Sequence, residues 1–282
     1  MAGSYAGTVR ILVVDAFTDR PFGGNPAGVC LLDRPVTDEW MQSVAAELKH
    51  SETAFVEPVE GDEAARATPA VDYRLRWFTP EVEVDLCGHA TLATSHVLFE
   101  RGEAGPIRFS TRSGVLTVTR DRSGAVGMDF PALPAQAAPA PDGLAAALGV
   151  TPVWTGRSRF DVVAVVDSEA AVRGLTPDLL ALAAVEARGV IVTARADGGA
   201  PYDFVSRFFA PSQGIPEDPV TGSAHCVLGP YWAKELDRPD GAPLTGAQLS
   251  ARGGTVAVTM RGDRIELAGR ARTVLEGELR GV

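Results

Sequence analysis

The chain carries one composite motif twice, and an internal repeat constrains the possible folds more than any other feature of this sequence. Residues 76–80 read Arg-Trp-Phe-Thr-Pro and residues 207–211 read Arg-Phe-Phe-Ala-Pro, so the two copies begin 131 residues apart. Each copy is followed by a glycine at the start of a helical pattern, Gly88 and then Gly222, which lie 134 residues apart. A loop that is three residues longer in the second copy accounts for the difference between these two spacings. The repeat therefore predicts two halves with the same fold.

The repeat extends toward the start of each half. A short helical pattern runs into an apolar strand at residues 45–56 and again at residues 183–193. Each half also has an early strand that is rich in β-branched residues and ends in Asp, at residues 11–15 and 162–167. Short apolar segments resemble one another by chance, but the ordered set favours a duplication.

The length of 282 residues suits two domains. A segment rich in proline and alanine, residues 131–141, can continue neither a helix nor a central strand, so we interpret it as an extended linker. The predicted domains are residues 1–130 and 141–272. A C-terminal strand near residues 273–282 is expected to return to the first half.

Each half combines many short strands with few helices. Hairpin patterns occupy residues 107–130 in the first half and 255–268 in the second. The clearest helical patterns cover Asp38–Leu48 and residues 90–101, 177–185 and 223–235. This mixture predicts an α+β fold with two pseudosymmetric domains, each a curved, mainly antiparallel sheet wrapped around a central helix.

Charge and cysteine content narrow the function classes. The formal net charge of −10 disfavours nucleic acid as a partner, because an acidic surface repels phosphate backbones. The chain has no apolar run long enough to cross a membrane and no signal pattern at its N-terminus, so we expect no membrane partner. The three cysteines and four histidines lack disulfide or metal-binding spacing. We therefore expect a reducing, cytoplasmic location and no metal.

The two predicted helix starts at Gly88 and Gly222 favour an anionic ligand. Free N–H groups in the first turn of a helix attract anions, and glycine allows the backbone to approach a ligand closely. If the halves are related by a pseudo-twofold axis, both helix starts can face one central cleft. Such an arrangement would hold a substrate carboxylate and stabilise the charge that develops when a carbon acid loses its proton.

Glu52 lies between a helical pattern and the apolar residues that follow it. A carboxyl group against an apolar wall tends toward a raised pKa, which a general acid/base needs near neutral pH. Taken alone, Glu52 is more simply a solvated turn residue. His89, Asp218 and Ser223 likewise have simple interpretations as residues that stabilise a helix start, and Asn25 as a turn residue.

Taken together, the motifs resemble the PhzF-like isomerase family of phenazine biosynthesis, whose fold is shared with diaminopimelate epimerase. The matching stretches are residues 14–18, 24–27, 51–55, 76–80, 87–91, 207–211 and 217–224. Any one of these stretches is a weak signal. The ordered set is specific, because it is distributed over both halves and nearly the whole chain.

This resemblance implies an active site between the two domains, a homodimer, and no metal or organic cofactor. In the best understood members a glutamate acts as general acid/base and moves a proton between carbons of a dihydro-hydroxyanthranilate. The resemblance implies that Glu52 is this glutamate. It also implies that His89 and Asp218 are further catalytic residues. The implied substrate-binding positions are Asn25, Gly88, Gly222 and Ser223.

Epimerases of this fold use two opposed thiols, one from each half. Cys87 is similar to the first, but Val220 stands near the place of the second, and Cys226 falls inside the following helix. The leading hypothesis is therefore a PhzF-like isomerase in which Glu52 transfers a proton on a small carboxylate-bearing substrate. The alternatives are an epimerase, racemase or lyase on the same scaffold, or a binding protein without catalytic activity.

Overall fold

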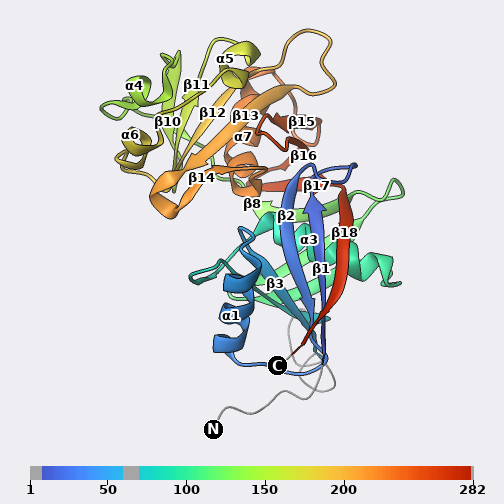
Figure 1. Ribbon diagram of the computed structural model, residues 1–282. Helices are drawn as coiled ribbons and strands as arrows, with labels where there is room; N and C mark the ends of the chain where they lie inside the picture. Colours follow the sequence, from blue (N-terminus) through green and yellow to red (C-terminus); the bar gives the residue numbers. More distant parts are fainter. Residues whose placement is uncertain (1–7, 60–69, 281–282) are drawn as a thin grey trace. The chain divides into compact units, whose positions relative to one another are not determined.

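The computed structural model describes residues 8–59 and 70–280 and divides into two compact units (Figure 1). The first unit is formed by the described residues of Met1–Met128 together with those of Gly269–Val282, and the second by Asp129–Ala268. Among the described residues, no helix combines the length and apolar character needed to cross a bilayer.

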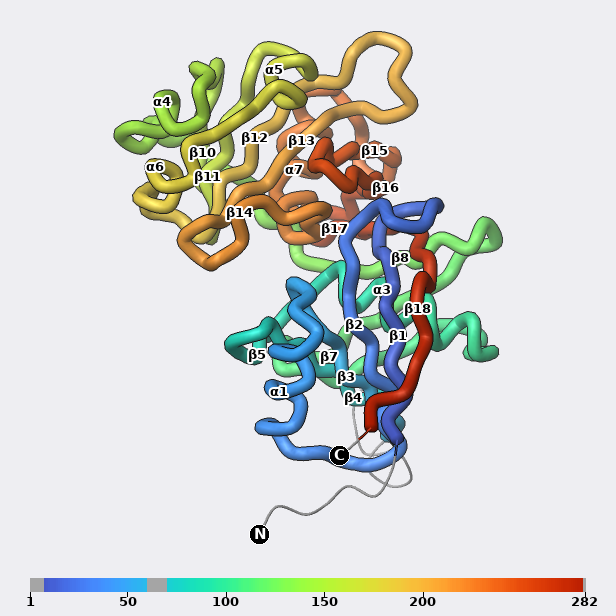
Figure 2. Tube along the Cα trace, in the orientation of Figure 1, coloured from blue at the N-terminus to red at the C-terminus, as the bar shows by residue number. Residues whose placement is uncertain are grey.

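The first unit is a curved sheet whose outermost strand comes from the end of the chain. The pairing order is β18–β1–β2–β3–β4–β6–β7–β8, and only the β2–β3 and β4–β6 pairs are parallel. Figure 2 shows β18, in red, running beside β1, in blue. The strands are β1 (Val9–Ala16), β2 (Asn25–Leu31), β3 (Thr53–Pro58), β4 (Tyr73–Phe78), β5 (Glu83–Val84), β6 (Ile107–Thr111), β7 (Gly114–Arg120), β8 (Val126–Pro131) and β18 (Ala271–Leu279).

Helix α3 (Gly88–Glu100) lies inside the curve of this sheet and contacts β1, β2, β3 and β18 (Figure 1). Its residues from His89 to Ser95 are all buried, so polar side chains in this stretch need internal partners. The hydroxyl groups of Thr91, Thr94 and Ser95 donate to carbonyl groups one turn earlier, at 2.6–2.8 Å. A central helix can therefore carry polar residues without losing hydrogen bonds.

Helix α1 (Asp38–Leu48) covers the opposite face of the sheet. The side chain of Thr37 accepts a hydrogen bond from the amide of Trp40 and caps its N-terminus. The apolar residues between helix and sheet form one buried cluster of Val9, Ile11, Cys30, Leu32, Met41, Val44, Ala45, Phe55 and Phe78. The first unit thus has a helix on each face of its sheet.

The second unit has the same kind of sheet, with α7 (Gly222–Glu235) against β15 and β16. Its strands are β9 (Gln136–Ala137), β10 (Trp154–Arg157), β11 (Asp161–Val165), β12 (Gly189–Arg195), β13 (Phe204–Ala210), β14 (Ile215–Asp218), β15 (Pro243–Gln248), β16 (Gly254–Arg261) and β17 (Arg264–Gly269). Its short helices are α4 (Leu144–Leu148), α5 (Glu169–Arg173), α6 (Leu179–Ala183) and the 3₁₀ helix η1 (Pro211–Gln213).

The strand pairing of the first unit recurs strand by strand in the second. The order β9–β10–β11–β12–β13–β15–β16–β17 repeats the first order, with β11–β12 and β13–β15 as the parallel pairs. The buried helix follows a short strand in both units, α3 after β5 and α7 after β14. The observed architecture is the α+β duplication that the repeated motif predicts.

The repeated arginine has a structural role in both units. Arg76 donates through Nε and Nη2 to the two carboxylate oxygens of Glu83, both at 2.7 Å. Arg207 makes the same pair of hydrogen bonds with Glu217, at 2.7 and 2.8 Å. Such bidentate pairs tie a long strand to the short strand beside it, just before the buried helix begins. The Arg-aromatic-Phe motif therefore supports each helix start.

Two segments differ in detail from the expectations. The helix expected at residues 177–185 is the five-residue α6, because the Asp178 side chain accepts from the amides of Leu180 and Ala181 and the chain turns after Ala183. Within residues 131–141, Gln136–Ala137 forms the short strand β9, which pairs with β10.

Candidate active site

Glu52 is held at the start of β3 by the neighbouring strand. Strands β2 and β3 are parallel, with Gly28 opposite Thr53, and the amide of Gly28 donates to the carbonyl oxygen of Glu52 at 3.3 Å. The strands approach closely there, since a Cβ atom on Gly28 would lie 3.0 Å from the hydroxyl of Thr53. The backbone of Glu52 is thereby fixed and its side chain is mostly buried, with 16% exposed.

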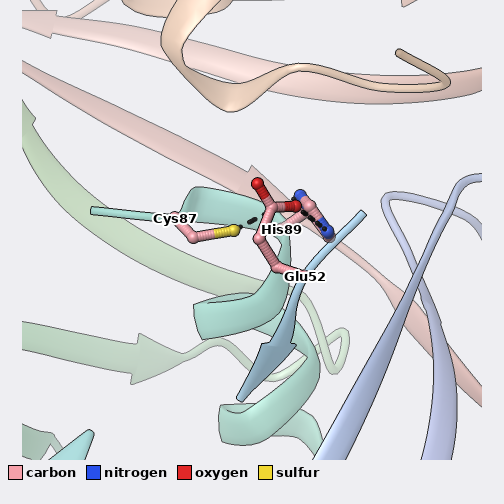
Figure 3. A group of neighbouring side chains, drawn as sticks. All are labelled: Glu52, Cys87 and His89. Carbon is pink, nitrogen blue, oxygen red and sulfur yellow. Dashed lines mark hydrogen bonds and ion pairs between the residues drawn. The ribbon is translucent and has the colours of Figure 1, made fainter. Parts of the chain in front are cut away.

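The start of α3 brings two more reactive side chains to Glu52. Cys87 is the N-cap residue, in an extended conformation, and its side chain makes no capping hydrogen bond. Its sulfur lies 3.5 Å from Nδ1 of His89, and Nε2 of His89 lies 3.3 Å from a carboxylate oxygen of Glu52. Figure 3 shows the three side chains together, with the carboxylate drawn between the sulfur and the imidazole. One ligand atom from each of the three lies within 4.8 Å of the others. These three residues are called the thiol–imidazole–carboxylate group below.

Burial controls the protonation of His89. Desolvation, with a smaller contribution from the charge of His50, lowers the pKa of His89 to about 3. His89 is therefore neutral near neutral pH, with one nitrogen that donates and one that accepts.

Asn25 lies at the first position of β2 and is completely buried. The turn before it depends on Gly24, which has φ of +61° and whose hypothetical Cβ would lie 2.0 Å from the carbonyl oxygen of Ala16. Since β2 and β3 are parallel, Asn25 and Glu52 lie toward the same end of their strands. The structure thus places Asn25 at the end of the sheet where Glu52 lies.

Asp218 ends β14 in the second unit and belongs to a dense hydrogen-bond network. The hydroxyl of Thr221 donates to its carboxylate at 2.5 Å. The amide group of Gln248 donates to the Asp218 carbonyl oxygen at 2.7 Å and accepts from the Thr221 backbone N–H at 2.9 Å. Asp218 is 8% exposed, so its carboxylate is held in one orientation four residues before the start of α7.

Ser223 follows Gly222 in the first turn of α7 and accepts a hydrogen bond from Arg188 Nη2 at 3.0 Å. The same guanidinium donates to both carboxylate oxygens of Asp161, at 2.9 and 2.6 Å. Asp161 is 2% exposed, so it anchors the arginine from the protein interior. Because the Ser223 oxygen accepts from Arg188, its hydroxyl proton remains available for a ligand.

A hollow in the second unit lies around this arginine. It is lined by Arg157, Ser158, Arg159, Phe160, Asp161, Glu186, Ala187, Arg188 and Gln213. The guanidinium of Arg188 lies 5.2 Å from the centre of the half-exposed Phe160 ring. The lining combines cationic and aromatic groups, which suits a ligand that carries a carboxylate.

The predicted residues thus fall into two local groups. Glu52 and His89 lie together in the first unit, at the helix start that contains Gly88. Asp218 lies with Gly222 and Ser223 at the helix start of the second unit. Sequence reasoning missed Asp161, Arg188, Thr221 and Gln248. The signal for Arg188 was an arginine directly before the apolar segment that becomes β12.

One positional assignment is corrected by the structure. Cys87 and Thr221 are the N-cap residues of α3 and α7, so Thr221, and not Val220, is the counterpart of Cys87. Cys226 lies inside α7 and is buried. The position equivalent to Cys87 therefore carries a hydroxyl group instead of a second thiol.

Comparisons with known proteins match this architecture. The family model described as phenazine biosynthesis-like protein matches residues 14–277. An uncharacterized isomerase of Halalkalibacterium halodurans is 45% identical over 276 residues, which cover 96% of this chain and 98% of that protein. The crystal structure of a PhzF-family phenazine biosynthesis protein from Enterococcus faecalis superposes with a TM-score of 0.87 at 39% identity, covering 97% of this chain and 99% of that one.

A more distant neighbour shares the fold alone. A Pseudomonas aeruginosa protein described as a predicted epimerase is 23% identical, with a TM-score of 0.67, and the match covers 96% of this chain and 99% of that one. Together these neighbours confirm the α+β fold expected from the sequence.

Proposed function

Because this chain belongs to the phenazine biosynthesis-like (PhzC-PhzF) family, we propose that it is an isomerase that moves a proton on a small carboxylate-bearing substrate, without a cofactor, with Glu52 as general acid/base. The name of the Halalkalibacterium halodurans relative supports the reaction class. The observation that carries the proposal is the 3.3 Å separation between the Glu52 carboxylate and the buried imidazole of His89.

The chemistry follows from the surroundings of Glu52. The carboxylate removes a proton from a carbon that is made acidic by a neighbouring electron-withdrawing group, and then returns it to another carbon. Nε2 of the neutral His89 imidazole lies 3.3 Å from the carboxylate, and the ring does not compete for the proton as a strong base would. The sulfur of Cys87 lies 3.5 Å from the other ring nitrogen, Nδ1.

The group at the start of α7 is proposed to bind the substrate carboxylate. The backbone N–H groups of Gly222 and Ser223 in the first turn of α7, the Ser223 hydroxyl and the Arg188 guanidinium provide donors of the type that carboxylates prefer. Asp218, fixed by Thr221, is proposed as a second acid/base. We propose that this group and the thiol–imidazole–carboxylate group serve the same reaction.

An epimerase is the second candidate, and the contact between Cys87 and His89 favours it. A thiol beside an imidazole can be activated as a base or nucleophile. A two-base racemase would also need an opposed thiol, and Thr221 occupies the equivalent position in the second unit. The isomerase with a carboxylate base therefore remains the preferred function.

Incorporation of deuterium from solvent tests the proposal. Small cyclic and amino carboxylates are incubated with the protein in D₂O, and label at carbon is followed by NMR. We expect the Glu52→Gln variant to lose exchange and turnover of the responding compound. Glu57→Gln is the matched control, because it makes the same change in β3, the strand that directly follows Glu52, at a residue that pairs with Arg74.

Each outcome separates the candidates. Exchange by Glu52→Gln at the wild-type rate would show that another residue is the base. If Cys87→Ser lost as much deuterium exchange and turnover as Glu52→Gln, the epimerase would be favoured. The homodimer stays a prediction that light scattering can test.

A further inference from the structure

The thiol–imidazole–carboxylate group contains the donor types that bind thiophilic divalent metal ions. Among residues 8–59 and 70–280, Glu52, Cys87 and His89 form a group whose ligand atoms, one from each residue, all lie within 4.8 Å of one another. Thiolate sulfur, imidazole nitrogen and carboxylate oxygen are the usual ligands of Zn²⁺ in proteins. This set is therefore chemically complete for a three-ligand site with one open position.

The distances are close to those that a tetrahedral ion requires. Zn–S and Zn–N bonds of about 2.3 and 2.0 Å place the two ligand atoms roughly 3.5 Å apart. The sulfur of Cys87 and Nδ1 of His89 are 3.5 Å apart. The Glu52 oxygen lies 3.3 Å from the other ring nitrogen, so the carboxylate or the ring must move by about 1 Å to complete the set.

The backbone of the group is already ordered. Cys87 is the N-cap of α3 and His89 lies in its first turn, and the backbone of Glu52 is fixed by the hydrogen bond from Gly28. The glutamate side chain can make most of this adjustment, because it is the most exposed of the three and has flexible torsions. The partly exposed side of Glu52 also provides access for the ion and for a water molecule in the fourth position.

We propose that Glu52, Cys87 and His89 bind one Zn²⁺ ion per chain, with water as the fourth ligand. Binding forms Zn–S, Zn–N and Zn–O bonds, releases the thiol proton of Cys87 to solvent, and displaces water from the hydrated ion. The bound ion is neutralised by the thiolate and the carboxylate. If the proposed function is right, zinc occupies the catalytic carboxylate and inhibits the isomerase reversibly.

Cobalt titration of the full-length protein tests the site without a substrate. Co²⁺ binds in the same geometry and shows a thiolate-to-metal charge-transfer absorption in the near ultraviolet. We expect this absorption to saturate at one Co²⁺ per chain and to disappear when Zn²⁺ is added. The Cys87→Ser variant should lose the absorption, and Glu52→Gln and His89→Asn should each weaken binding by at least about tenfold.

Two variants serve as matched controls. His96→Asn removes a histidine of the same helix that also pairs with a glutamate, Glu100, at 3.3 Å. Cys226→Ala removes another buried thiol. Both controls should keep wild-type cobalt binding, and circular dichroism of every variant checks that it is folded.

The results also distinguish this proposal from the proposed function. Wild-type protein without the charge-transfer absorption, or a Cys87→Ser variant that keeps it, would overturn the zinc site. If cobalt binds as expected while Glu52→Gln still exchanges substrate protons at the wild-type rate, the metal site stands and the catalytic role of Glu52 fails. If Glu52→Gln abolishes exchange and wild type binds no cobalt, the catalytic role of Glu52 stands and the metal site fails.

Discussion

The guanidinium of Arg188 donates to the hydroxyl oxygen of Ser223 at 3.0 Å while both oxygens of the buried Asp161 hold it in place. The arginine therefore has a fixed orientation before any ligand arrives. A fixed donor loses little conformational entropy on binding, so its hydrogen bonds contribute efficiently to affinity. This relationship places a cationic group beside the first turn of α7.

Arg188 should control affinity for the substrate carboxylate. A hydrogen bond to a charged group contributes about 1.5–3 kcal/mol, so Arg188→Gln should raise KM by roughly ten- to a hundredfold and change kcat less. The constants are measured on the compound that responds in the deuterium screen. Arg157→Gln is the control, because Arg157 lines the same hollow but donates to the Glu186 carbonyl oxygen. Equal KM values for the two variants would show that Arg188 does not bind the carboxylate.

The repeated arginine motif should affect stability more than an exposed ion pair does. Arg76 is 22% exposed and its partner Glu83 is 10% exposed, whereas Arg10 and Glu276 are 49% and 56% exposed. Exposed pairs contribute about 0–1 kcal/mol and the loss of one partner of a buried pair costs about 3–5 kcal/mol. We expect Arg76→Met to lower the free energy of unfolding by about 2 kcal/mol, between these limits.

Urea unfolding of Arg76→Met and Arg10→Met measures this difference directly. The Arg10 variant should lie within about 1 kcal/mol of wild type. Equal losses in both variants would mean that the Arg76–Glu83 pair does not support the sheet.

The duplicated fold could be predicted from the sequence because its repeated elements are local. The same elements recur in the same order in both halves: strand patterns, the Arg-aromatic-Phe motif and the glycine at each helix start. Each of them reflects a contact between segments that are close in the sequence. Glu52 and His89 could be named as site residues, and the structure brings their side chains to within 3.3 Å.

The partners of the second group could not be predicted because distant segments supply them. Arg188 meets Asp161 because β11 and β12 pair in parallel with Asp161 opposite Gly189. Gln248 reaches Thr221 from the end of β15. A one-residue uncertainty in the repeat also put Val220 in the place of Thr221. The register of the strands identifies these partners, and the first residue of α7 shows which residue is equivalent to Cys87.

Gly24 should be the least replaceable residue of the β1–β2 turn. An alanine there would have φ of +61° and would place its Cβ 2.0 Å from the Ala16 carbonyl oxygen. Gly102 also has a positive φ, +104°, but its hypothetical Cβ meets no atom within 4 Å among the described residues. We expect Gly102→Ala to cost about 1 kcal/mol and Gly24→Ala clearly more, because it adds a backbone clash to the strain.

Thermal unfolding of the two glycine variants gives the comparison. Since the turn positions Asn25, Gly24→Ala should also reduce the deuterium exchange of any folded fraction. Equal melting temperatures for the two variants would show that the turn relaxes around the added methyl group.

His225 should make the protein less stable in mild acid. It is fully buried in α7, its Nδ1 donates to the Thr221 carbonyl oxygen at 2.8 Å, and its ring lies against Phe204. Desolvation lowers the pKa of His225 to about 4, while the hydrogen bond to Thr221 opposes this shift only in part. The ordinary pKa of histidine is about 6.5, so the unfolded chain takes up a proton before the folded protein does.

The direction of the pH effect follows from these two pKa values. Above about pH 6.5 His225 is neutral in both states and has no effect on the pH dependence of stability. As the pH falls from 6.5 toward 4, protonation favours the unfolded state and the free energy of unfolding decreases. Below pH 4 both states are protonated and the loss of stability stops growing.

Urea unfolding of wild type and His225→Gln at several pH values isolates this contribution, because the other titrating groups are common to both proteins. The difference between the two free energies should change between pH 6.5 and 4, and a constant difference across that range would show that His225 is not buried in its neutral form.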